Sequence, residues 1–148
     1  MMNYKIGVDV GSTTVKLAIL NDSNELVYSK YERHFSDIRS TIISLVNKCY
    51  DALGDIDCTI CITGSGGLSI SKWLDLDFVQ EVISCSKTVE EIIPQTDVVI
   101  ELGGEDAKIT YFKGGIEQRM NGSCAGGTGE FIDQLAVLLN TDAGGLHE

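Results

Sequence analysis

Apolar and polar residues alternate along the first part of the chain, which is the pattern of β-strands with one buried face. The alternation is clearest in YKIGVDV at residues 4–10 and resumes in VKLAIL at 15–20. A third such segment lies near residues 26–33, after the polar run NDSNE. Three strands in succession, joined by the turn at 11–14 and a second polar turn, predict an antiparallel meander.

The hydrophobic period then changes from two to about 3.6 residues, which predicts a helix. Ser36 is its expected N-cap and Gly54 its expected stop. Its apolar face combines Ile38, Ile42, Leu45, Val46, Cys49 and Leu53. A strand is predicted at 58–63, and a second helix within 79–93 is expected to end before Pro94, the only proline of the chain.

A second block of strands begins after this proline. Strands are predicted at 98–102, 107–112 and 116–120. The helix that follows carries an apolar face of Phe131, Ile132, Leu135, Leu138 and Leu139. Meanders followed by helix and strand predict an α/β fold with mixed sheets. We therefore expect a first lobe at residues 1–94 and the start of a second, similar lobe at 95–148.

The composition narrows the class of protein without identifying it. The chain has 148 residues, 43% of them hydrophobic, which is enough for a packed core. A formal net charge of −11 argues against binding of nucleic acid or of an anionic membrane surface. No apolar run approaches the ~20 residues that span a bilayer, and no basic-then-apolar leader follows Met1. With five cysteines, an odd number, we expect a cytoplasmic protein in a reducing compartment.

An internal repeat connects the two blocks. DVGSTTVK at 9–16 aligns without gaps with ELGGEDAK at 101–108, which lies 92 residues later (101 minus 9). A carboxylate, a glycine and a lysine coincide in this alignment. Either two strand–turn–strand hairpins are merely alike, or two related lobes each offer a turn to the same ligand.

The first of these turns suits a phosphate group. Gly11–Thr14 offers consecutive backbone N–H groups and three hydroxyls, an arrangement that binds phosphate oxygens. Asp9, at the end of the preceding strand, is suited to hold Mg²⁺ through water. Lys16 supplies a positive charge, although exposure to solvent explains a lysine there equally well.

The second turn offers similar groups. Glu101 is the equivalent carboxylate, and Gly103 with Gly104 is the equivalent anion nest. Glu105 or Asp106 is a candidate for orienting a hydrolytic water. Two nests, two carboxylates and Mg²⁺ suit phosphoryl transfer, in which positioning and charge neutralisation contribute most. Neither a GxxxxGK[ST] loop nor a GxGxxG fingerprint occurs, which excludes P-loop and Rossmann interpretations.

Cys124 lies in the glycine-rich segment MNGSCAGGTGEFIDQLAVLL at 120–139. The segment leads into the start of the last predicted helix, where N–H donors and a partial positive charge are expected. A thiolate in such a place has a lowered pKa and can ligate a metal or an iron–sulfur cluster. The pattern therefore favours a redox role for Cys124.

Three segments together resemble a known family. DVGSTTVKLAIL and ELGGEDAKITYF resemble the first and second phosphate motifs of the actin, heat-shock chaperone and sugar-kinase ATPase superfamily. MNGSCAGGTGEFIDQLA is similar to a segment of one branch, the activators of 2-hydroxyacyl-CoA dehydratases, also described as benzoyl-CoA reductase-type ATPases. The resemblance extends over essentially the whole chain and implies a ribonuclease H-like, actin-like fold.

The resemblance also implies a mechanism. ATP hydrolysis by a homodimer in anaerobes would deliver one electron from a shared [4Fe–4S] cluster to a CoA-ester dehydratase or reductase. The groups that would meet the phosphates and Mg²⁺ are Asp9, Gly11, Ser12, Thr13, Thr14, Lys16, Glu101, Gly103 and Gly104. Cys124 would be the first cluster ligand, and Glu105 stands at the position of the water-orienting group.

The chain departs from the family pattern at specific positions. Glu101 and Glu105 stand where the family more usually has Asp and Gln, and no cysteine follows Cys124. We expect the second cluster ligand and the adenosine site to lie beyond Glu148, so the chain resembles the front portion of an activator. Two alternatives stay open: a small-molecule kinase of the same superfamily, and a catalytically silent nucleotide-binding or scaffold module.

Overall fold

The computed structural model describes residues 3–121, 128–142 and 144–147. The chain forms two compact units, Met1–Ser84 and Cys85–Glu148. The division lies inside helix α3 (Glu81–Ile92), ten residues before the lobe boundary expected at Pro94 (94 minus 84). The assignment of the two expected lobes stays a prediction, and each unit is described by itself.

The first unit contains a five-stranded mixed sheet in the order β3-β2-β1-β4-β5. The β1–β2 and β2–β3 pairs are antiparallel, whereas β4 is parallel to β1 and β5 is parallel to β4. The bounds are β1 Tyr4–Val10, β2 Thr14–Leu20, β3 Leu26–Arg33, β4 Cys58–Thr63 and β5 Asp77–Phe78. The predicted meander and the predicted fourth strand are therefore confirmed.

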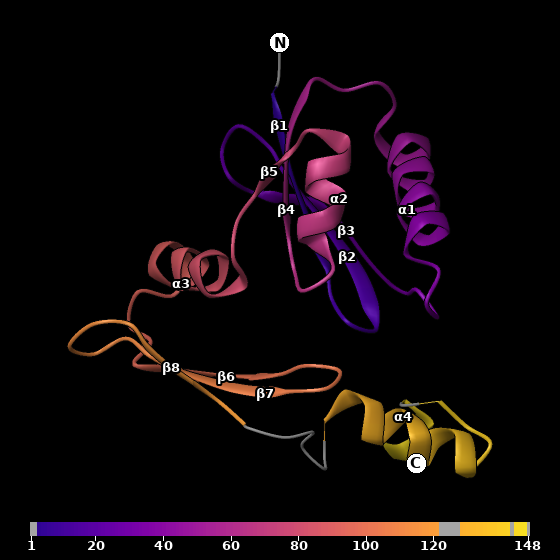
Figure 1. Ribbon diagram of the computed structural model, residues 1–148. Helices are drawn as coiled ribbons and strands as arrows, with labels where there is room; N and C mark the ends of the chain where they lie inside the picture. The colour runs from indigo at the N-terminus through magenta and orange to yellow at the C-terminus, as the bar shows by residue number, and fades with distance from the viewer. Residues whose placement is uncertain (1–2, 122–127, 143, 148) are drawn as a thin grey trace. The chain divides into compact units, whose positions relative to one another are not determined.

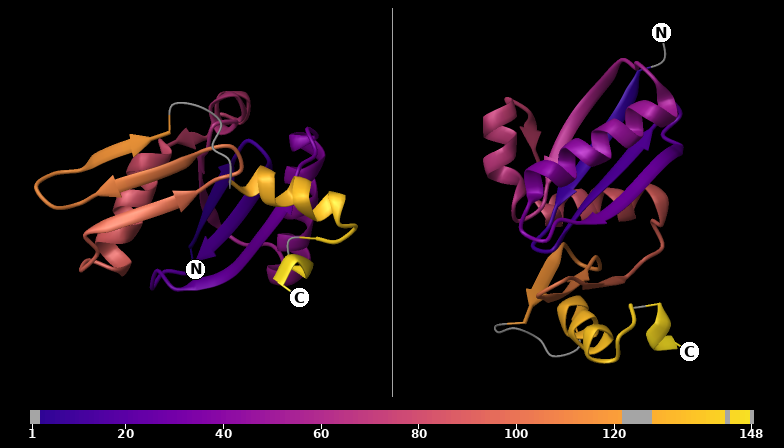
Figure 2. Two further views of the ribbon diagram at one scale, coloured as in Figure 1. Left: turned by 90° about the horizontal axis from the view of Figure 1, so that it is seen from below. Right: turned by 90° about the vertical axis from the view of Figure 1, so that its right-hand side faces the viewer.

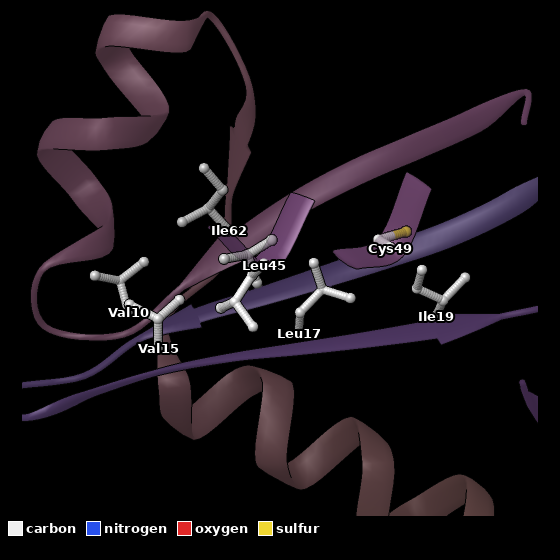
Figure 3. Close-up of a cluster of buried hydrophobic side chains, with 8 residues drawn as sticks. Val10, Val15, Leu17, Ile19, Leu45, Cys49 and Ile62 are labelled. Carbon is white, nitrogen blue, oxygen red and sulfur yellow. The ribbon is translucent and has the colours of Figure 1, made fainter. Parts of the chain in front are cut away.

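Two helices cover one face of this sheet. Helix α1 (Ile38–Leu53) packs on β2 and β3, and helix α2 (Gly67–Leu74) packs on β4 and β5 (Figure 1). The core between this face of the sheet and the helices consists of Val8, Val10, Val15, Leu17, Ile19, Leu45, Cys49 and Ile62. Figure 3 shows strand residues such as Val15 and Leu17 together with Leu45 and Cys49 of α1. Because β-strand side chains alternate, Asp9 and its neighbours across the strands lie on the opposite face.

The start of α1 differs from the prediction. Asp37, not Ser36, is the N-cap, and its side chain accepts a hydrogen bond from the Ser40 N–H at 3.1 Å. Ser36 lies outside the helix in a left-handed conformation, with φ of 68°. The predicted stop is confirmed, because Gly54 adopts φ of 73° and its N–H donates to the Tyr50 carbonyl.

The second unit contains a three-stranded antiparallel sheet in the order β6-β7-β8 (Figure 2). Its elements are β6 Val98–Leu102, β7 Ala107–Tyr111, β8 Glu117–Met120, helix α4 Gly129–Leu138 and the 3-10 helix Gly145–His147. Within the described residues α4 buries only Ala136, and all five residues of its predicted apolar face are exposed. The described helices include none of the length and apolar character needed to cross a bilayer.

Candidate nucleotide-binding turns and their supports

The first candidate turn, Gly11–Thr14, connects β1 to β2. The pair Val10 and Val15 closes its base, and the Gly11 N–H donates to the Thr14 carbonyl at 2.9 Å. Ser12 is exposed, Thr13 is half-buried, and Thr14 is buried as the first residue of β2. Among the described residues the N–H groups of Ser12 and Thr13 have no hydrogen-bond partner, as an anion nest requires.

His34 holds this turn, although the sequence gives no reason to assign it a role. It lies just after β3 with only 7% of its surface exposed. Its Nδ1 accepts a hydrogen bond from the Ser36 N–H at 3.0 Å, so the ring proton belongs on Nε2. Nε2 lies 3.2 Å from the Gly11 carbonyl and donates to it, and the His34 N–H donates to the Thr13 carbonyl at 3.1 Å.

Asp9 lies beside the turn with its two oxygens in different situations. Lys16, its partner across the antiparallel pair, donates from Nζ to Oδ2 at 2.7 Å. The expected positive charge is therefore in contact with the expected carboxylate. The Asp9 Oδ1 atom is buried and has no hydrogen-bond partner among the described residues.

The turn after β4 packs closely against Asp9. Gly64 adopts φ of 97°, and a Cβ at this position would lie 2.3 Å from the Val10 carbonyl oxygen and 2.5 Å from Asp9 Oδ1. The Gly66 N–H donates to the Val10 carbonyl at 2.9 Å. Only glycine fits at residue 64, because both the backbone conformation and the available space exclude a side chain.

The second candidate turn has the same construction. Glu101 pairs with Lys108 and Leu102 with Ala107, as Asp9 pairs with Lys16 and Val10 with Val15. The Gly103 N–H donates to the Asp106 carbonyl at 2.8 Å, as Gly11 does to Thr14. The same register and turn hydrogen bond recur 92 residues apart, so the repeat is structural.

The carboxylate of the second turn lies among other polar groups. Glu101 Oε2 is buried without a partner among the described residues. Burial, and next the charge of Glu101, raises the pKa of the Cys85 thiol above its usual range, and Lys108 partly offsets this. Lys108 also lies 3.5 Å from Asp106. Glu105 is exposed at the tip of the turn.

Cys124 lies outside the described residues, but both flanks of its segment contact the second turn. On one side, the Ala107 N–H donates to the Asn121 side chain at 2.8 Å, and the Asn121 N–H donates to the Ala107 carbonyl at 3.2 Å. On the other side, the first N–H group of α4, from Gly129, donates to the Gly103 carbonyl at 2.9 Å. The next, from Glu130, donates to Gly104 at 2.8 Å. Two N–H groups that we expected to face the cysteine loop are thus used by the second turn.

Buried side-chain atoms without partners are few in the part of the chain that the structure describes. They are Asp9 Oδ1, Thr63 Oγ1, Ser86 Oγ and Glu101 Oε2. Two of them belong to the carboxylates that the sequence identified as candidate Mg²⁺ ligands. The other two, like His34 and Gly64, carried no sequence signal that distinguished them from ordinary core or turn residues.

A mixed sheet in the order 3-2-1-4-5, followed by a second unit with the same strand–turn–strand build, has the fold of the actin-like ATPase class. The profile of the BadF/BadG/BcrA/BcrD ATPase family matches residues 6–144, and the chain belongs to this family. The fold and the family resemblance expected from the sequence are therefore confirmed.

Relatives of this chain include proteins named as activators of CoA dehydratases. The activator of lactoyl-CoA dehydratase from Anaerotignum propionicum is 34% identical over 93% of this chain and 54% of its own length. The (R)-2-hydroxyglutaryl-CoA dehydratase activating ATPase from Acidaminococcus fermentans is 30% identical over 100% of this chain and 58% of its own length. The chain thus spans just over half the length of these relatives.

A solved structure supports the same relationship. The activator of 2-hydroxyisocaproyl-CoA dehydratase from Clostridium difficile, with bound ADPNP, aligns with a TM-score of 0.80 and 31% identity. The alignment covers 95% of this chain and 53% of that one. Component A of the Acidaminococcus fermentans (R)-2-hydroxyglutaryl-CoA dehydratase aligns with a TM-score of 0.79 and 27% identity.

Proposed function

We propose that this chain is the front part of an ATP-hydrolysing activator that delivers a low-potential electron to a 2-hydroxyacyl-CoA dehydratase or a related CoA-ester reductase. In this proposal Gly11–Thr14 and Gly103–Gly104 bind the phosphates of ATP and ADP. Asp9 and Glu101 hold Mg²⁺, and Lys16 adds positive charge at the first turn. Glu105 is our candidate for orienting the hydrolytic water, because it is exposed at the tip of the second turn.

The observation that carries the proposal is the matched pair of carboxylates. Asp9 and Glu101 occupy equivalent positions before equivalent turns, and each keeps one buried oxygen without a partner among the described residues. A buried carboxylate oxygen normally has a hydrogen bond or a cation. Magnesium prefers carboxylate and water oxygens, so the residues present fit this ion. Bound Mg²⁺ would neutralise phosphate charge during hydrolysis.

The redox part of the proposal depends on Cys124 and on the family. We propose that Cys124 thiolates from two protomers contribute to one [4Fe–4S] cluster, which would carry the transferred electron. Two thiolates are fewer than the usual four ligands, so we propose that the remaining ligands lie outside residues 1–148, in a longer protein of the relatives' length. The anchors at Asn121 and Gly129 support a connection to nucleotide state, because both contact the strand and turn that would bind phosphate.

In this proposal, movement of the start of α4 relative to the cluster would change the reduction potential of the cluster. Helix N-termini carry a partial positive charge, which stabilises added negative charge nearby. Moving such a helix end away from the cluster on ATP binding would make its reduced form a stronger donor. Equal midpoint potentials with ADP and with ATP in the longer protein would contradict this step.

Nucleotide binding tests the ATPase part of the proposal. Calorimetry with ADP should show that Mg²⁺ raises affinity, and Asp9→Asn and Glu101→Gln should each abolish that gain. Asp51 and Glu91 are exposed carboxylates of α1 and α3, so Asp51→Asn and Glu91→Gln are the matched controls and should keep the gain. No Mg²⁺-dependent ADP binding by the unsubstituted chain would favour the silent-module alternative.

Iron and sulfide analysis tests the redox part. Anaerobically purified longer protein should lose both on Cys124→Ser, whereas Cys58→Ser, at an exposed free cysteine, should leave them unchanged. Partner activation should follow the iron content. Full activation by the Cys124→Ser variant would refute the cluster assignment and favour the kinase alternative.

A further inference from the structure

A row of side chains crosses the first sheet on the face opposite the core. In the strand register Thr63 of β4 lies beside Asp9 of β1, Asp9 beside Lys16 of β2, and Lys16 beside Tyr31 of β3. In the two antiparallel pairs, in-register neighbours on one face have Cβ atoms about 4.5–5.5 Å apart, whereas Thr63 and Asp9 are neighbours in a parallel pair. Lys16 is held from both sides, by Asp9 at 2.7 Å and by the Tyr31 ring at 6.0 Å.

Asp9 and Thr63 form the unsatisfied end of this row. Lys16 occupies Asp9 Oδ2, which leaves Oδ1 buried without a partner in the described part of the chain. Thr63 Oγ1 is buried and without a partner in the same way. These two oxygens belong to adjacent residues in the register, yet no hydrogen bond joins them.

Gly64 packs against one of these two oxygens. A Cβ at residue 64 would lie 2.5 Å from Asp9 Oδ1, so only glycine leaves this oxygen in its place beside Thr63. Buried polar groups that are too far apart for a direct bond are commonly bridged by a water molecule. A threonine hydroxyl both donates and accepts, whereas an ionised carboxylate only accepts, so a water that donates to Asp9 can also bind Thr63.

We propose that Thr63 and Asp9 Oδ1 together hold one water molecule that belongs to the hydration shell of the bound Mg²⁺. Thr63 is then a positioning residue, which fixes the direction of a metal-bound water beside the first phosphate turn. Magnesium keeps several of its waters when it binds to proteins, which makes such an outer contact available. The inference rests on the proposed nucleotide site and adds to it a polar group on β4.

Substitutions at residue 63 test this role through the effect of Mg²⁺ on ADP affinity. The quantity measured is the gain in ADP affinity between excess chelator and saturating Mg²⁺. Thr63→Val should reduce that gain about tenfold, the lower end of the usual cost of removing an outer-shell partner. Thr63→Ser restores a hydroxyl and should keep the gain. Thr59→Val makes the same replacement on the same face of β4, four positions away, and should also keep it.

A control without metal separates positioning from packing. In chelator, Thr63→Val should bind ADP as the parent does and melt at no lower temperature, since valine has nearly the shape of threonine and removes an unpaired hydroxyl. Equal weakening with and without Mg²⁺ would assign Thr63 to packing and overturn the inference. Should the valine variant fold poorly, Thr63→Ala carries the same prediction.

The Asp9→Asn variant distinguishes failure of this inference from failure of the proposed site. If Asp9→Asn loses the Mg²⁺ gain while Thr63→Val keeps it, the nucleotide site stands and the water contact is refuted. If Asp9→Asn keeps the gain, Asp9 does not hold the metal, and both proposals fall. No Mg²⁺ gain in the unsubstituted chain likewise overturns both.

Discussion

Removal of the His34 side chain tests whether the first turn depends on support from outside its own hairpin. His34→Ala deletes two side-chain hydrogen bonds, one to the Gly11 carbonyl and one from the Ser36 N–H, at a position only 7% exposed. At about 0.5–1.5 kcal/mol for each bond, the free energy of unfolding should fall by about 1–3 kcal/mol. For a chain of this size that lowers the melting temperature by about 2–12 °C.

Two conservative variants assign the loss to one of the two contacts. Glutamine at residue 34 can still donate to the Gly11 carbonyl, whereas asparagine can still accept from the Ser36 N–H. If the Gly11 contact shapes the phosphate nest, His34→Gln should retain Mg²⁺–ADP affinity and His34→Asn should lose it. Calorimetry measures the affinity and circular dichroism the melting.

The matched control is Lys30→Gln, which places the same new side chain at an exposed position of β3. It should leave melting temperature and affinity unchanged. The reasoning fails if His34→Ala has the same melting temperature as Lys30→Gln. It also fails if His34→Asn binds nucleotide and His34→Gln does not.

Two further predictions concern the elements around the carboxylates. Gly64→Ala should cost about 3 kcal/mol or more, because it adds a Cβ clash to a strained φ of 97°, whereas Gly54→Ala, at φ of 73° in open space, should cost about 1 kcal/mol. Equal losses in denaturant titrations would show that Gly64 is not tightly packed. Because the Cys85 pKa is raised by folding, the folded chain keeps a proton that the unfolded chain releases above about pH 8.5. The free energy of unfolding should therefore fall as pH rises through this window, and less steeply in Cys85→Ser. Cys58→Ser should follow the parent, and identical slopes in all three chains would contradict the assigned burial.

Local signals were sufficient for the strands and the two turns. Alternation located β1 and β2, and the gap-free match of residues 9–16 with 101–108 indicated two strand–turn–strand segments, which the structure shows to have the same register. These features depend on residues close together in sequence, so composition and periodicity describe them well. The position of Asp9 and Glu101 before their turns follows for the same reason.

Contacts between distant segments were beyond this reasoning. His34 is 23 residues from Gly11, and Gly64 is more than fifty residues from Asp9, yet each lies against its partner. Nothing in the local sequence distinguishes a histidine that holds a turn from one that faces solvent. The N-cap was misplaced for a related reason: the His34 ring accepts from the Ser36 N–H, Ser36 adopts a left-handed conformation, and the cap moves to Asp37.

The two equivalent turns also differ in what supports them, and this difference bears on how a nucleotide signal could travel. The Gly11 carbonyl and its equivalent, Gly103, both accept a hydrogen bond from outside their own turn. In the first unit the donor is the side chain of His34, which belongs to the same sheet and its connection to α1. In the second unit the donor is the backbone N–H of Gly129, the first residue of the helix that follows the Cys124 segment.

A shift of the first turn is therefore opposed by a packed core, whereas a shift of the second must move the start of α4 or break its first hydrogen bonds. In the proposed mechanism this makes the second turn the one able to transmit a change of phosphate occupancy to Cys124. The first turn would keep its position during that change. Gly129 approaches Gly103 so closely that an added Cβ would lie 3.2 Å from its carbonyl oxygen, so a larger residue there requires a shift of a few tenths of an ångström at this contact.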